Sequence, residues 1–251
     1  MMTFHLKLGK GVQRQDTLWL AKRGQTMNAT RKGVLAAAAV CGLLTCAQVA
    51  RGASATWLGT ADGTWATEEN WSAAPVPGAG DTATFSGAGN GNTAISLGSG
   101  VAVGKLVFDT ASAASYTVGS GGAGAQTLTL GTVGDVVAMG PTVAAAQRLD
   151  ANLALATTGT YTLTNASTAA ALTVAGGIST TSSGIKVLSV MGEGDTTVSG
   201  AITAGTGTMN LLKAGSGTLT LSGGGVFSGN GVNCYLPGSV WVPANLRQGH
   251  T

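Results

Sequence analysis

Few side chains of this sequence could carry out chemistry, and the carboxylates are the first to consider. Beyond Asp135 the regular part of the chain holds three acids, Asp150, Glu193 and Asp195. Glycoside hydrolases use paired carboxylates, so an enzyme that degrades polysaccharides would need these acids to meet on one face. Glu193-Gly194-Asp195 separates two apolar runs, which predicts a turn, where Asp and Gly are common for conformational reasons. We therefore favour a solvated turn over a catalytic or calcium site.

Histidine is nearly absent from the chain. The two histidines are His5 and His250, near the two ends. A Ser-His-Asp, Cys-His or histidine-based metal site in the body of the chain would need the C-terminal segment to fold back. The glycine clusters lack the following Lys and helix of a phosphate-binding loop. We expect no enzymatic activity, no cofactor and no metal.

Three tryptophans, Trp57, Trp65 and Trp71, precede a long stretch without Trp. Exposed indole rings could stack on sugar rings and make this segment a carbohydrate-binding site. The same rings could instead shield the open end of a repetitive fold, where unpaired backbone and apolar core must be covered. Their mixture with Pro and acidic residues favours the cap.

The formal charge of +3 suggests a nucleic-acid ligand only until the basic residues are located. Eight of the 13 precede Thr56: Lys7, Lys10, Arg14, Lys22, Arg23, Arg31, Lys32 and Arg51. The rest of the chain has five basic residues against nine acidic ones, so it has no basic patch for nucleic acid.

The basic N-terminal region contains the three parts of a cleavable signal peptide. Arg31 and Lys32 precede an apolar run from Gly33 to about Ala47, and Ala53-Ser54-Ala55 forms a small-x-small cleavage site. The run is shorter than the roughly 20 residues that a membrane span needs. We expect the secretion machinery to export the chain and cleavage after Ala55 to leave no stable membrane span.

Two further expectations follow from this signal. Residues 1–26 carry no apolar run of their own, which suggests a start codon assigned too early, with Met27 as the true start. Cleavage would also remove Cys41 and Cys46, so Cys234 would have no intramolecular disulfide partner.

From Ile95 to Leu221 the chain alternates apolar and polar residues in short runs separated by Gly, Ser, Thr and Asn. Alternation at period two predicts strands with one buried face. Runs every 9 to 12 residues or so fit an all-β sandwich or a solenoid. The drifting repetition of one short phrase favours a parallel β-helix of roughly 20 to 30 residues per turn, with a β-sandwich as the alternative.

The phrase is clearest in "KAGSGTLTLSGGGVFSGNGV", which resembles the autotransporter-associated beta strand repeat. The matching residues are Lys213, Gly215, Gly217, Thr218, Leu219, Thr220, Leu221, Ser222, Gly223, Gly229 and Val232, with Phe227 where an aromatic residue is usual. The resemblance implies a right-handed β-helical passenger region of a secreted or surface-displayed bacterial protein, structural or adhesin-like in role. It implies no catalytic residues. The family's pattern stops after Val232, and no segment there is long enough for a translocating barrel, so we expect a passenger fragment.

These observations divide the chain into five parts. They are a pre-signal segment (1–26), a signal peptide (27–55), a Trp- and Pro-rich N-terminal cap (56–90), the β-strand repeats (91–232) and a divergent or truncated tail (233–251). The expected partners outside the cell are a surface polysaccharide or a host or neighbouring cell surface. The alternatives are a carbohydrate-binding β-sandwich module and a solenoid enzyme that degrades polysaccharides.

Overall fold

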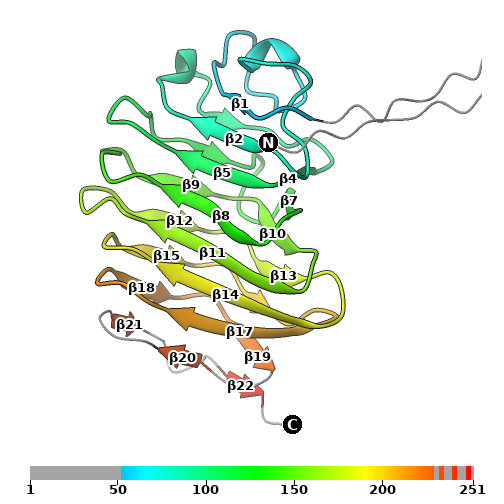
Figure 1. The fold of residues 1–251 in the computed structure, drawn as a ribbon, viewed down its shortest axis with the longest axis vertical. Helices are drawn as coiled ribbons and strands as arrows, with labels where there is room; N and C mark the ends of the chain where they lie inside the picture. The colour runs from blue at the N-terminus through cyan, green and yellow to red at the C-terminus, as the bar shows by residue number, and fades with distance from the viewer. Residues whose placement is uncertain (1–51, 229–231, 235–238, 242–246, 250–251) are drawn as a thin grey trace, which may run out of the picture. The chain divides into compact units, whose positions relative to one another are not determined.

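Short strands stack side by side into three parallel sheets, which the chain visits in a fixed order (Figure 1). The computed structural model describes residues 52–228, 232–234, 239–241 and 247–249, all within one compact unit, Gln48–Thr251. One strand from each sheet makes one turn of a parallel β-solenoid of about seven turns.

The strands of each sheet follow one another along the stack. The first sheet contains β1 (Ala55–Thr56), β2 (Thr82–Phe85), β5 (Lys105–Phe108), β8 (Gly134–Met139), β11 (Gly159–Asn165), β14 (Ile185–Met191), β17 (Thr208–Lys213) and β20 (Val232–Cys234). The second contains β3 (Ala94–Ile95), β6 (Thr117–Val118), β9 (Gln147–Leu149), β12 (Leu172–Val174), β15 (Thr196–Val198), β18 (Thr218–Leu221) and β21 (Ser239–Trp241). The third contains β4 (Val101–Val103), β7 (Thr127–Leu130), β10 (Asn152–Leu155), β13 (Ile178–Thr180), β16 (Ile202–Thr203), β19 (Gly225–Ser228) and β22 (Arg247–Gly249).

This architecture confirms the predicted parallel β-helix. Every pairing between two strands of the described residues is parallel. The β-sandwich alternative is wrong, because a sandwich is built from antiparallel strands. The only helices in the described part of the chain are two short 3-10 turns, Glu68–Asn70 and Gly89–Gly91.

The register sets the length of each turn. Val190 of β14 lies beside Lys213 of β17, 23 residues further on, whereas Leu106 of β5 lies beside Val137 of β8, 31 residues further on. The longer turn includes the glycine-rich loop between β6 and β7, and β8 itself contains a bulge where its pairing with β11 shifts.

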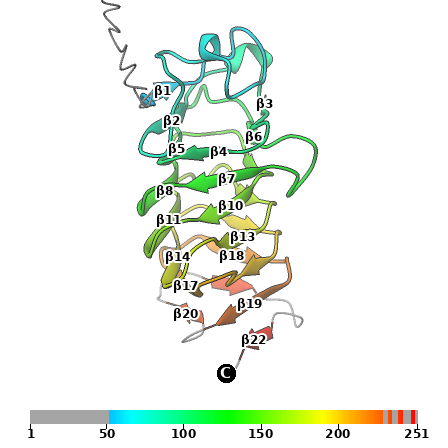
Figure 2. The ribbon, with the colours of Figure 1, turned by 90° about the vertical axis from the view of Figure 1, so that its right-hand side faces the viewer.

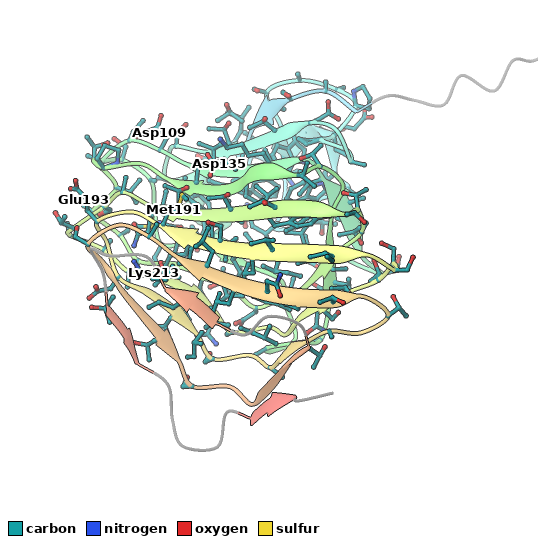
Figure 3. The ribbon with its side chains drawn as sticks, turned by 60° about the horizontal axis from the view of Figure 1, so that its bottom comes forward. Asp109, Asp135, Met191, Glu193 and Lys213 are labelled. Atoms are coloured by element: carbon teal, nitrogen blue, oxygen red, sulfur yellow. The ribbon has the colours of Figure 1, made fainter. Side chains whose placement is uncertain are left out.

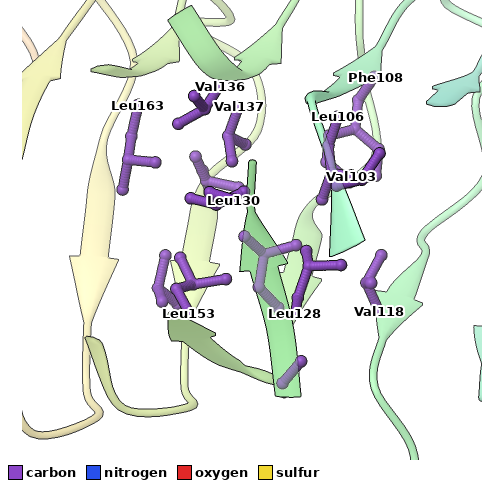
Figure 4. Packing of buried hydrophobic residues seen from close by; sticks show 14 of the residues in the cluster. Val103, Leu106, Phe108, Val118, Leu128, Leu130, Val136, Val137, Leu153 and Leu163 are labelled. Atoms are coloured by element: carbon purple, nitrogen blue, oxygen red, sulfur yellow. The ribbon is translucent and has the colours of Figure 1, made fainter. Parts of the chain in front are cut away.

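Leu, Val and Ile side chains fill the interior between the three sheets. In β7, Leu128 and Leu130 are buried while Thr127 and Thr129 are only partly covered, so the strand alternates as its sequence predicts. Equivalent residues of successive turns, such as Leu128 and Leu153, pack on one another (Figure 4). Strands of neighbouring turns lie roughly 4.8 Å apart, which leaves no space between these layers for water.

Candidate functional site

The segment between β1 and β2 covers the end of the solenoid at which the first sheet begins (Figure 2). Its three indole rings pack edge to face, with centroids 5.0 Å apart for Trp57 and Trp71 and 4.7 Å apart for Trp65 and Trp71. Phe85 of β2 lies against all three, and its ring stacks on Phe108 of β5. The aromatic cluster therefore continues into the core of the first turns.

Each indole N–H also has a backbone partner. Trp57 Nε1 donates to Asn92 O at 2.9 Å, Trp65 Nε1 to Pro77 O at 3.2 Å and Trp71 Nε1 to Trp65 O at 2.8 Å. The exposed fractions of these tryptophans are 1%, 1% and 4%, respectively. None of these three indole faces is presented to solvent, which supports a cap rather than a sugar-stacking platform.

Asn70 organises the loop that carries the tryptophans. Its buried amide oxygen accepts from the N–H groups of Ala61 and Asp62, and its amide nitrogen donates to Asp62 Oδ1 at 2.7 Å and Thr64 O at 3.0 Å. Hydrogen bonds to the exposed Asp62 carboxylate, first from the Thr64 N–H and then from Asn70, lower the pKa of Asp62.

Tyr116 carries the polar end of the aromatic cluster. Its ring centroid lies 5.0 Å from that of Phe85, and its hydroxyl donates to Gly87 O at 2.7 Å. Burial disfavours the phenolate and raises the pKa of Tyr116. The hydroxyl is thus kept as a donor that joins two turns.

The three candidate carboxylates do not meet. Asp150 follows β9, at the corner between the second and third sheets, whereas Glu193 and Asp195 follow β14, at the corner between the first and second sheets (Figure 3 labels Glu193). Asp150 Oδ1 lies 2.6 Å from Arg148 Nε, and Asp195 Oδ1 accepts the N–H of Thr218 at 2.8 Å. Two of the acids therefore have structural partners, and the arrangement cannot hold one sugar between all three.

A depression of about 300 Å³ lies beside Glu193 and Asp195 and is otherwise lined by Thr168–Ala171 and Gly194. Glu193 and Asp195 are both exposed, as predicted for a turn. No group of three or more His, Cys, Asp or Glu residues in the described part of the chain is arranged to hold a metal ion.

The repeat motif forms one corner and one strand of a turn. Lys213, Leu219 and Leu221 are buried, and Thr218 and Thr220 are the partly covered alternating positions of β18. The Ser222 N–H donates to Val198 O of the preceding turn at 3.0 Å. Gly229 lies outside the described residues.

The motif glycines pack against glycines of the preceding turn. A Cβ at Gly215 would lie 2.3 Å from Gly192 O, one at Gly217 2.1 Å from Gly194 O, and one at Gly223 2.2 Å from Gly200 O. Real Cβ atoms do not approach backbone oxygens this closely, so the later turn can stack here only because it carries glycine at these three positions. Gly192 and Gly215 also have φ values of +113° and +81°.

The predicted cleavage site lies at the beginning of the folded unit. The Ala53 N–H donates to Pro75 O, Ser54 Oγ accepts the Thr82 N–H at 2.9 Å, and Ala55 is 6% exposed and pairs with Ala83. The Ala55–Thr56 bond is part of β1, so a peptidase could cut it only before this turn forms. No helix among the residues placed in the structure is long and apolar enough to cross a bilayer.

Sequence reasoning did not identify the polar side chains inside the solenoid. Lys186 and Lys213 are 0% and 2% exposed, and Asn165 and Gln147 are buried as well. Lys213 Nζ donates to Ala214 O at 2.8 Å and Gly215 O at 3.0 Å, so it binds the corner that follows its strand. The alternation of the strand could have predicted this burial, because Lys186 lies at the same inward-facing positions as Leu188 and Val190.

No protein-family model, curated protein sequence or solved structure matches this chain.

Proposed function

We propose that this protein is a secreted or surface-displayed, non-enzymatic β-solenoid, a structural or adhesin-like passenger segment of the kind that the repeat resemblance implies. The observation that carries the proposal is the stacking of motif glycines on glycines of the preceding turn. The close stacking of these glycines in a parallel solenoid supports the repeat resemblance.

The distribution of charge supports an uncharged or cationic partner. Residues 52–224 contain four basic side chains, of which Lys186 and Lys213 are buried. The other two, Lys105 and Arg148, are partly exposed and form ion pairs with Asp135 and Asp150. The surface that remains is acidic, and it would repel nucleic acid. A neutral surface polysaccharide or a cell-surface protein fits it better.

Export is tested by expressing residues 1–251 in a Sec-competent bacterium and measuring the intact mass of the product in each fraction. We expect an extracytoplasmic protein that begins at Thr56. A variant with Leu43→Lys and Leu44→Lys, which interrupts the apolar run, should stay unprocessed in the cytoplasm. A wild-type product that keeps Met1 in the cytoplasm would contradict export.

The role of the exported product is tested by its fluorescence during titration with soluble polysaccharides. Because Trp57, Trp65 and Trp71 are buried, we expect binding, where it occurs, to leave their emission maximum unchanged. A saturable blue shift would favour the carbohydrate-binding alternative. Hydrolysis of the polysaccharide, detected as new reducing ends, would contradict the non-enzymatic role.

A further inference from the structure

The corner between β13 and β14 surrounds a buried positive charge with oxygen atoms. Lys186, the first inward residue of β14, is 0% exposed. Its Nζ donates to Ser182 O at 2.5 Å, Ser182 Oγ at 2.8 Å and Ser183 O at 2.6 Å. Three oxygens of two consecutive residues thus bind a single ammonium group.

No carboxylate of the described residues forms an ion pair with Lys186. An ammonium group taken out of water costs several kcal/mol unless other dipoles replace its hydration. Here two carbonyls and one hydroxyl replace the water, much as carbonyl oxygens replace the hydration shell of a potassium ion in a selectivity filter. The corner therefore has the chemistry of a monovalent-cation site.

Neighbouring turns also contact Ser182, which supplies two of the three oxygens. The Ser182 hydroxyl donates to Ala156 O of the preceding turn at 2.6 Å. On the other side, the next turn passes so close that a Cβ at Gly207 would lie 2.7 Å from Ser182 O. Packing from both sides fixes Ser182, so the cage does not depend on the ammonium alone.

The same corner offers a path to solvent. Ser183 and Gly184 are exposed, although Lys186, which donates to Ser183 O, is buried. A small cation could therefore reach the cage from outside once the lysine stem is removed. Lys186 and Lys213 are buried, whereas the ammonium group of Lys105 lies on the outer face, 2.7 Å from the Asp135 carboxylate.

We propose that the Ser182–Ser183 corner is a binding site for a monovalent cation of the ammonium or potassium kind, which the chain fills with its own Lys186. The inference does not depend on the proposed function. It predicts that a variant without the lysine ammonium binds an external cation at this corner. It also predicts that the external cation restores the stability that the substitution removes.

The test compares Lys186→Ala with Leu188→Ala, which removes a buried apolar side chain from the same strand. Thermal unfolding is followed in propylammonium, ammonium, potassium and sodium chloride at equal ionic strength. In sodium chloride we expect both variants to unfold roughly 10 °C below the wild type. Propylammonium, ammonium and potassium should raise the midpoint of Lys186→Ala saturably by half or more of that loss, and leave Leu188→Ala at its sodium value.

Lys186→Met serves as the second variant, since it keeps an apolar stem and removes only the charged group. It should respond to ammonium and potassium but not to propylammonium, whose stem has no room. The proposal is overturned if the lysine variants respond to the four salts as Leu188→Ala does. It is equally overturned if they stay unfolded in every salt.

Discussion

The first turns and the later turns of the solenoid solve the same packing problem with different side chains. Around β1, β2 and β5 the interior is filled by Trp57, Trp65, Trp71, Phe85, Phe108 and Tyr116, whereas from β11 onward it is filled mainly by Leu, Val and Ile together with buried lysine and amide groups. A middle turn is covered on both sides by its neighbours and needs only side chains that match the layers above and below. A terminal turn has a neighbour on one side only, so another segment of the chain must cover its open side. Large aromatic rings cover this area with few residues, and their N–H groups donate to backbone carbonyls.

The polar groups inside the later turns show the other half of this difference. Corners bring backbone carbonyls inward, and interior side chains bind them: the ammonium groups of Lys186 and Lys213 and the amide of Asn165. In the first turns, the hydroxyl of Tyr116 and the indole N–H groups donate to backbone carbonyl oxygens. Among the described residues, indole donors thus gather at the covered end and buried ammonium donors occur only in the later turns, whereas amide and tyrosine donors are found in both.

The largest difference expected from this comparison is in lysine reactivity. Lys105 has a side chain that is 32% exposed, whereas Lys186 is fully buried, so acetylation of Lys186 requires the unit to open. For a domain of ordinary stability we expect Lys186 to react at least roughly 1,000-fold more slowly than Lys105. Mass spectrometry of peptides after timed labelling measures both rates in one sample.

Equal rates at Lys105 and Lys186 would contradict the buried cation. Labelling in denaturant provides the control, because the two amines should then react alike.

The next effect tests the aromatic cap. Trp65→Ala should lower the free energy of unfolding by about 3 to 5 kcal/mol, since it empties a large volume and removes one of the rings that pack on Trp71 and Phe85. Urea unfolding followed by circular dichroism measures the loss. Trp65→Phe keeps an aromatic ring and should lose less, and a loss below about 1 kcal/mol for Trp65→Ala would show that the ring is not part of the core.

The matching test in the later turns is Leu163→Ala. Leu163 of β11 lies between Val137 and Val190 of the adjacent turns and is fully buried, so we expect a loss of about 2 to 5 kcal/mol in urea unfolding. Thr162→Ala, on the neighbouring outward position, should change stability by less than about 0.5 kcal/mol. If the two substitutions had equal effects, the assigned inward and outward faces of β11 would be wrong.

These tests also mark how far the sequence alone could go. The alternation in Thr127–Leu130 and Thr218–Leu221 was sufficient to predict strands and their buried face, because period two is a local property. The repetition of one phrase along the chain then favoured a parallel solenoid over a sandwich. The glycine contacts between Gly192 and Gly215 were not predictable as contacts, because they depend on the register between turns. The buried lysines were missed for a related reason. A lysine in a sequence is expected to be exposed to solvent, and only the structure shows which carbonyl oxygens can bind its ammonium group inside the fold.

The fate of the candidate acids shows the same limit. Asp150, Glu193 and Asp195 were considered together because they are the acids of the regular part of the chain beyond Asp135, and Glu193 was correctly expected on an exposed turn. To assign each acid to a corner, one must know which strands of the sequence form each turn. The repeats vary too much in length and sequence to show this. The structure separates Asp150 from Asp195 because β9 and β14 belong to different sheets.

A smaller effect is expected where an amide, rather than a ring or a leucine, joins two turns. Asn165 Nδ2 donates to Ala170 O at 3.0 Å and Asp195 O at 2.8 Å, and Oδ1 accepts the Ser167 N–H at 3.0 Å. Asn165→Ala removes the amide donor to Ala170 O, one of the two donors to Asp195 O and the acceptor of the buried Ser167 N–H, and it should cost about 2 kcal/mol in urea unfolding. Thr164→Ala, which affects only an outward hydroxyl bonded to Asp135, is the matched control, and equal losses would refute the bridging role.

The smallest effect concerns the carboxylate that orders the cap loop. The lowered pKa of Asp62 means that the folded state favours the charged form, so this stabilisation is present above the unfolded pKa near 4 and is lost as pH falls through the lower folded value. The urea midpoint of the wild type should therefore fall more between pH 5 and pH 2 than that of Asp62→Asn, which has no carboxylate to protonate. Because Asp62 is exposed, the difference should be modest and should shrink in high salt. Glu193→Gln, which removes a charge from an exposed turn outside the cap, should keep the wild-type dependence on pH. If Asp62→Asn kept that dependence too, the carboxylate would not order the cap loop, and the covered end would depend on its aromatic rings alone.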